Sequence, residues 1–155
     1  MNRIWKKRMR QEMWRKMKKI IVPKKLYHAA PECVLMDIQT GGLKSNFGQI
    51  YAASTPADAM NFMWFRLLDH PHYKFENGKI VGMELERHDR IYVFEISTNR
   101  TKIDCWDVGT DHSSAFFGGT ESWVYAGKNI ERRAISDITY FTREMIDAAR
   151  SAVKM

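Results

Sequence analysis

Two aromatic residues, Tyr51 and Phe62, occupy positions from which they could hold a flat ring between them. Tyr51 lies in a short apolar stretch, Ile50–Ala53, that reads as a β-strand, and Phe62 lies well inside the helix predicted to begin near Pro56. Aromatic side chains that reach one cleft from two elements can stack on a planar ligand. The alternative is that both rings belong to the hydrophobic core, as most large aromatic side chains do.

The stretch around these rings, residues 48–63, predicts a strand, a tight turn and the start of a helix. Ser54 or Thr55 can cap that helix, and Pro56 suits its first position, where the missing N–H is not needed. Asp58 falls in the first turn, where a carboxylate meets the positive end of the helix. The pattern therefore predicts a helix over residues 55–69 that begins directly beside Tyr51.

A histidine and a glutamate lie at the ends of two other predicted strands. His28 closes a short strand, 24–29, and Glu121 opens the strand 121–126. Each also has an ordinary interpretation, because a histidine at a strand end and a solvated glutamate are both common. Phe116 and Phe117 lie in a Gly- and Ser-rich loop, 109–120, and either fold back under that loop or face a partner.

The remaining pattern indicates an α+β fold with mostly antiparallel sheets, because strands outnumber helices and gather late in the chain. Further strands are expected at residues 80–84, 91–96 and 134–141, with a short extended segment at 103–106. Pro31 is expected to open a helix that ends at Gly41-Gly42, and Thr142 is expected to cap a last helix.

Charge divides the chain into a basic extension, residues 1–23, and a domain, residues 24–155. Residues 1–25 hold 11 of the 25 Lys and Arg residues and one acid, so they carry +10, whereas the remainder carries −3. An apolar stripe among the cations predicts a basic amphipathic helix; it consists of Trp5, Met9, Met13, Met17 and Ile20. This helix would bind nucleic acid, an anionic membrane or an acidic protein surface, or would dock on its own domain.

Cysteine and histidine usage argues against a metal site. Cys33 and Cys105 are far apart and form no CxxC motif, which is typical of a reducing compartment without a disulfide framework. His70 and His72 flank Pro71 without a further evident ligand, so residues 70–79 are interpreted as a plain loop. No transmembrane segment or signal peptide is evident, which indicates a cytoplasmic location.

Several of these segments, taken in order, resemble the ADP-ribosyltransferase superfamily, in the branch with a His–Tyr–Glu triad that includes diphtheria-toxin-like enzymes and poly(ADP-ribose) polymerases. The matching segments are Tyr27-His28, Gly42-Leu43 and the strand Gly48–Ala53 of the type G-x-x-Y-x-A. Glu121–Tyr125 matches the glutamate strand loosely, and Phe62 stands where the family usually has a second ring-stacking tyrosine.

This resemblance covers residues 25–140 and implies a split pair of antiparallel sheets, with flanking helices, that holds NAD as substrate in a cleft. It implies that Glu121 stabilises the ribose cation, that His28 binds a ribose hydroxyl and that Tyr51 and Phe62 stack on nicotinamide. The backbone of Ala29 would bind the carboxamide. The loop with Phe116 and Phe117 would face a macromolecular acceptor, protein or nucleic acid.

Two departures from the family pattern narrow the expected reaction. Gly119 stands where arginine-modifying relatives carry a second glutamate, which disfavours arginine as acceptor, and Ala59 replaces a small hydroxyl residue. The leading hypothesis is mono-ADP-ribosyl transfer by a small enzyme of bacterial or phage type. Two alternatives stay open: a catalytically silent binding module that acts through the basic helix, and an RNA 2′-phosphotransferase.

Overall fold

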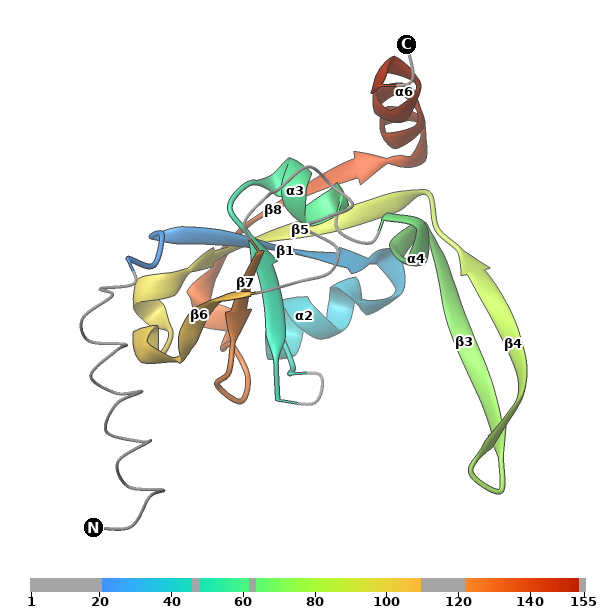
Figure 1. Ribbon diagram of the computed structural model, residues 1–155, viewed down its shortest axis with the longest axis horizontal. Helices are drawn as coiled ribbons and strands as arrows, with labels where there is room; N and C mark the ends of the chain where they lie inside the picture. The colour runs from blue at the N-terminus through green and yellow to red at the C-terminus, as the bar shows by residue number, and fades with distance from the viewer. Residues whose placement is uncertain (1–20, 46–47, 62–63, 110–121, 154–155) are drawn as a thin grey trace, which may run out of the picture.

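The computed structural model describes residues 21–45, 48–61, 64–109 and 122–153, which form a mixed α+β fold (Figure 1). Six strands make one antiparallel sheet in the order β6-β7-β2-β1-β5-β8, and β3 and β4 form a separate two-stranded sheet. The strands are β1 (Lys25–Pro31), β2 (Ile50–Ala53), β3 (Asp69–Glu76), β4 (Lys79–Arg87), β5 (Arg90–Ser97), β6 (Trp106–Gly109), β7 (Ser122–Tyr125) and β8 (Ile135–Thr142). The expectation of an α+β fold with antiparallel sheets is confirmed.

The described helices are short. The α-helices are α2 (Leu35–Gly41), α3 (Pro56–Asn61), α4 (Trp64–Leu68) and α6 (Arg143–Val153), and the 3-10 helices are η1 (Glu32–Val34), η2 (Thr98–Arg100), η3 (Ile103–Cys105) and η4 (Arg132–Ala134). Among these described helices, none has the length and apolar character needed to cross a bilayer.

The large sheet changes direction between β1 and β2. β1 pairs with β5 along its whole length, whereas its register with β2, over the described residues, is the single pair Tyr27↔Ala53. β2 in turn pairs with β7, so that Ala53 lies opposite Ser122. Figure 1 shows β2 and β7 running steeply across the direction of β1 and β5. The sheet therefore consists of two three-stranded halves that meet at one row of residues.

Hydrophobic side chains form a core on each face of the sheet. Alternation along β5 shows this division, since Phe94 and Ile96 join one cluster while Ile91 and Val93 join the other. Ile38 of α2 belongs to the first cluster. The second cluster takes residues from α3, α4 and α6, namely Ala59, Met60, Leu68 and Ile146. Helices thus cover both faces of the sheet.

The predicted helix caps are present. The backbone N–H of Asp58 donates to Thr55 Oγ1 at 3.1 Å, and the backbone N–H of Met145 donates to Thr142 Oγ1, also at 3.1 Å. Gly42 ends α2 with a positive φ of 79°, which favours glycine. These local signals explain why α2, α3 and α6 begin or end where the sequence predicts.

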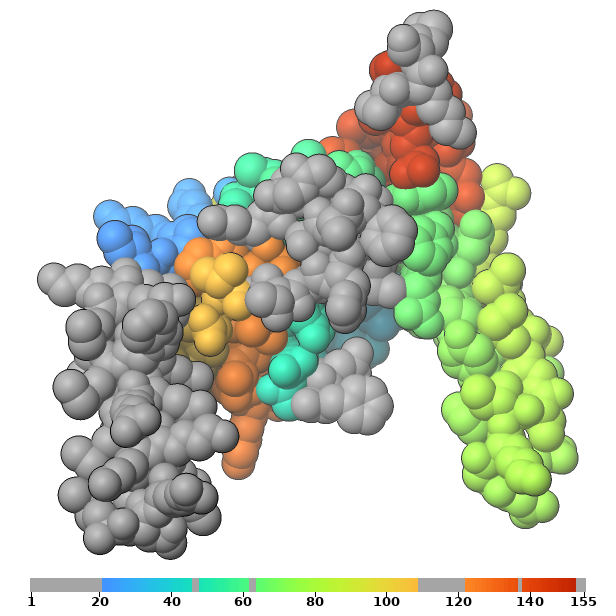
Figure 2. All heavy atoms as spheres, viewed as in Figure 1, coloured from blue at the N-terminus to red at the C-terminus, as the bar shows by residue number. Residues whose placement is uncertain are grey.

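The hairpin β3–β4 projects from the body of the protein, as Figure 2 shows in yellow-green. Its register places Pro71 opposite Leu85 and Tyr73 opposite Met83, which gives one apolar face. Arg143 Nη2 donates to the Leu68 and His88 carbonyl oxygens at 3.2 and 2.8 Å, so the start of α6 holds the base of the hairpin.

Three sequence predictions of local structure are wrong in part or in full. Residues 70–76 are not loop but most of β3, because pairing with β4 satisfies their backbone despite Pro71 at this edge. Residues 103–105 are not extended but form η3, whose C-cap Trp106 donates its N–H to Ile103 O. The helix expected from Pro31 begins later, because β1 continues through Pro31 and past His28. The basic helix predicted over residues 1–23 lies almost wholly outside the described residues.

Candidate functional site

His28 and Tyr51 meet at the junction of the two halves of the sheet. His28 lies in β1 and Tyr51 in β2, and the imidazole Nδ1 of His28 is 2.6 Å from the carbonyl oxygen of Tyr51. A carbonyl oxygen only accepts hydrogen bonds, so Nδ1 carries the proton and donates it. In the neutral ring Nε2 is then an acceptor. The structure thus brings two of the three predicted triad positions together.

This contact joins a side chain to main chain and not two side chains. Side chains alternate along β1, so His28 lies on the same side of the strand as Leu26 and Ala30, whose side chains enter the first core. In β2, Tyr51 lies on the same side as Ala53, which enters the second core. Because β1 and β2 share one register pair, the imidazole reaches across the junction to the Tyr51 backbone.

The surroundings of His28 favour the neutral imidazole. Desolvation by burial lowers the pKa of His28 from its ordinary value, and the hydrogen bond with Tyr51 opposes this only in part. A neutral ring at physiological pH keeps Nε2 free of a proton. His28 can therefore accept a hydrogen bond from a hydroxyl group of a ligand.

Tyr51 is the exposed member of the pair. Its side chain is 40% exposed, while its neighbours Ile50 and Ala52 are buried in the first core. The phenol donates a hydrogen bond to Gln49 Oε1 at 2.8 Å. The interpretation of Tyr51 as a core residue is therefore wrong.

Ala29 follows His28 and is half-buried. Its backbone pairs with Val93 of β5 on one side. On the other side, over the described residues, the register of β1 with β2 is at Tyr27 and does not extend to Ala29. Over the described residues, the ladder between β1 and β2 therefore does not include Ala29.

Five predicted site residues lie outside the described part of the chain: Phe62, Phe116, Phe117, Gly119 and Glu121. The residue after Glu121 is described, however. Ser122 begins β7, is buried, and lies opposite Ala53, which itself pairs with Tyr27. In the sheet, β7, which follows Glu121, is next to β2, which contains Tyr51. β2 is in turn next to β1, which contains His28.

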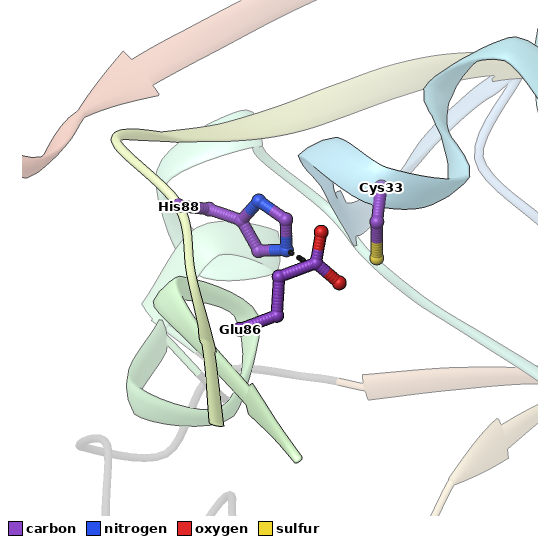
Figure 3. A group of neighbouring side chains, drawn as sticks. All are labelled: Cys33, Glu86 and His88. Carbon is purple, nitrogen blue, oxygen red and sulfur yellow. Dashed lines mark ion pairs between the residues drawn. The ribbon is translucent and has the colours of Figure 1, made fainter. Parts of the chain in front are cut away.

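A second group of reactive side chains, absent from the sequence predictions, lies where η1 meets the base of the hairpin. Donor atoms of Cys33, Glu86 and His88 all lie within 4.8 Å of one another, and Figure 3 shows the three side chains converging. His72 Nε2 lies 2.5 Å from Glu86 Oε2. The sequence offered a hint in the spacing of His70 and His72, but Cys33 is remote in sequence and only the fold brings it here.

Ionisation in this second group is mutually linked. The hydrogen bond from His72 is the main cause that lowers the pKa of Glu86, which favours its carboxylate. Desolvation, followed by the charge of Glu86, raises the pKa of the Cys33 thiol. The group thus combines a carboxylate, imidazoles and a thiol, which are the donor types that bind first-row divalent metals.

A scan against models of protein families matches none, and a search of curated protein sequences gives no significant match.

Proposed function

We propose that this chain is a mono-ADP-ribosyltransferase that moves ADP-ribose from NAD to a macromolecular acceptor and releases nicotinamide. The observation that carries the proposal is that β1, β2 and β7 are neighbours in the sheet. His28 lies in β1, Tyr51 lies in β2, and Glu121 directly precedes β7. Strands at residues 25–31, 50–53 and 122–125 become neighbours only through the fold. This adjacency supports a common site for the triad inferred from the family resemblance.

His28 would bind the ribose next to nicotinamide. Its Nδ1–H donates to the Tyr51 carbonyl oxygen, and Nε2 of the neutral ring would accept a hydrogen bond from a ribose hydroxyl. Desolvation lowers the pKa of His28 and so maintains this acceptor. The residue orients the sugar and does not need to transfer a proton.

Tyr51 would bind the nicotinamide ring by stacking. Its side chain is exposed, and the Gln49 amide oxygen orients the phenol. Phe62, the second aromatic of the sequence pattern, would cover the opposite face of the ring. The backbone of Ala29, which the ladder between β1 and β2 does not use, would bind the carboxamide.

Glu121 would stabilise the reacting sugar. When the bond between nicotinamide and ribose breaks, nicotinamide leaves with the bonding electron pair and positive charge develops on the ribose. The Glu121 carboxylate would stabilise this cation. A nucleophilic atom of the acceptor then forms the new bond to ribose and loses its proton.

The finer architecture belongs to the same proposal. A split pair of sheets would correspond to the halves β6-β7-β2 and β1-β5-β8, which meet at Tyr27↔Ala53. NAD would lie along this division. Phe116 and Phe117 would face the acceptor, and the basic residues before position 24 would guide the enzyme to nucleic acid or to an acidic protein.

The test is nicotinamide release from NAD by the full-length protein, with a mixed cell lysate as acceptor. Glu121→Gln retains the shape of the side chain but removes its charge, and we expect turnover to fall by about 100-fold to 1000-fold. The matched control is Glu131→Gln, at an exposed ion pair with Arg133, which should retain wild-type turnover. Absence of turnover in a folded wild-type protein would contradict the proposal and favour the silent binding module.

A further inference from the structure

The base of the β3–β4 hairpin gathers metal-binding side chains from two elements. Glu86 lies in β4, His88 follows that strand directly, and Cys33 comes from η1. Figure 3 shows the Cys33 thiol, the Glu86 carboxylate and the His88 imidazole directed toward a common space. The donor atoms are within 4.8 Å of one another. Bonds of about 2.0–2.3 Å to zinc would place neighbouring donors about 3.3–3.7 Å apart.

His88 supplies an independent observation that a ligand belongs here. Its side chain is only 6% exposed, and its buried Nε2 atom has no hydrogen-bond partner among the residues that the structure describes. Glu86 Oε2 lies 3.9 Å from this nitrogen, which is too long for a hydrogen bond. A buried polar atom without a partner is unfavourable unless a water or an ion satisfies it.

The position of His88 is held by its own backbone. Its N–H donates to Leu68 O at 2.7 Å, and its carbonyl oxygen accepts from Arg143 Nη2 at 2.8 Å. On the other edge of the ring, Nδ1 lies 3.7 Å from Glu32 Oε2. Metal-binding histidines commonly turn one nitrogen to the ion and the other to a carboxylate, which orients the ring. The Glu32 carboxylate lies on the Nδ1 side of His88, at a distance longer than a hydrogen bond.

We propose that Cys33, Glu86 and His88 bind one zinc ion, which ties the hairpin to η1. Thiolate, imidazole and carboxylate together suit zinc, whereas magnesium and calcium prefer oxygen donors alone. Cys33 and Glu86 are exposed, so their side chains can turn by the small distance that closes the site. A water molecule would complete a tetrahedral site, and His72 would orient Glu86 from the outer shell.

The ion would have a structural role that is separate from the proposed transferase site. A two-stranded hairpin has little stability of its own, and this one projects from the body of the protein. Zinc would add a direct link between β4 and η1. Its binding free energy would then stabilise the folded hairpin, because the unfolded chain lacks a formed site.

The experiment uses full-length protein without a histidine tag. Metal is removed with a chelator, and zinc is titrated back in competition with a chromophoric chelator. We expect one high-affinity equivalent of zinc. Cobalt substitution should give a thiolate-to-cobalt charge-transfer band, which reports whether a cysteine is a ligand. Absence of a stoichiometric site in the wild-type protein would overturn the proposal.

Two matched pairs of variants locate the site. Cys33→Ser and Glu86→Gln should weaken zinc binding by about 100-fold, and Cys33→Ser should abolish the charge-transfer band. The controls are Cys105→Ser, at the other cysteine, and Glu84→Gln, two residues before Glu86 on the same strand. Both controls should bind zinc like the wild type. Loss of binding in Cys105→Ser, or unchanged binding in Cys33→Ser, would overturn the assignment.

Discussion

The imidazole Nδ1 of His28 lies 2.6 Å from the carbonyl oxygen of Tyr51, so a side chain of β1 is bonded to the main chain of β2 where these strands diverge. This bond couples two residues that are 23 positions apart in sequence. It determines which imidazole nitrogen is protonated, and the other nitrogen of the neutral ring is therefore a hydrogen-bond acceptor.

The first prediction concerns the pH dependence of stability. Because burial lowers the pKa of folded His28, the unfolded chain takes up a proton at a higher pH than the folded chain does. This residue's contribution is therefore complete above about pH 6.5 and is lost as the pH falls toward the folded pKa. In urea unfolding, the free energy of unfolding should decrease as the pH is lowered from about 8 to about 5.5. The decrease should be less steep in His28→Gln.

His70 also has a lowered pKa, mainly through desolvation, and contributes a slope of the same sign. The test therefore compares the pH dependence of stability in the wild type with that in His28→Gln, because stability is expected to depend on pH in both proteins. Parallel profiles over the whole range would show that His28 is not desolvated in the folded protein.

The second prediction concerns Tyr51 in the proposed NAD site. The phenol makes an exposed hydrogen bond with Gln49, so Tyr51→Phe should change the free energy of unfolding by no more than about 1 kcal/mol and retain the stacking surface. Tyr51→Ala removes that surface and should raise the KM for NAD up to about 10-fold. Steady-state nicotinamide release measures both effects. Equal KM values in the two variants would exclude stacking by this ring.

The third prediction concerns Gly42, which has a φ of 79° and a ψ of −166°. A Cβ atom there would lie 2.2 Å from the carbonyl oxygen of Ile130, which accepts a hydrogen bond from Leu43 N–H. Gly42→Ala should therefore lower the free energy of unfolding by at least about 2 kcal/mol in urea titrations.

The neighbouring glycine is the control for this substitution. A Cβ atom at Gly41 meets nothing within 4 Å in the described part of the chain, so Gly41→Ala should change stability by less than about 1 kcal/mol. If both alanine variants unfold at the same urea concentration, the close approach at Gly42 does not limit stability.

The fourth prediction concerns the basic residues at the start of the chain. If they bind nucleic acid, replacing Lys18 and Lys19 by Gln should weaken binding to labelled duplex DNA or RNA and reduce the salt slope by about 2. The control removes the same charge from the domain, at the exposed residues Lys102 and Lys128. Fluorescence anisotropy at several salt concentrations distinguishes the two. An equal loss in both variants would assign binding to net charge rather than to the extension.

The sequence by itself determined the elements whose signals are local. Thr55 and Thr142 cap their helices through bonds to nearby N–H groups, and Gly42 ends α2 because its backbone suits glycine. The apolar stretch 50–53 predicted a strand, and β2 spans these residues. These features depend on residues within a few positions of one another.

Only the tertiary structure decided features that depend on distant residues. The segment 70–76 is a strand because β4 pairs with it, although its histidines and proline read as a loop. Tyr51 is exposed whereas Ala53, on the same side of β2, is buried, and the apolar pattern of this strand does not encode that difference.

The two candidate sites differ in the same way. Family order in the sequence predicted His28 and Tyr51, and the fold added the bond from imidazole to main chain. The proposed zinc site was not predictable, because Cys33 reaches Glu86 and His88 through the packing of η1 against the hairpin base. The local sequence predicts where strands lie and where helices end. The meeting of metal-donor side chains from separate elements depends instead on how those elements pack.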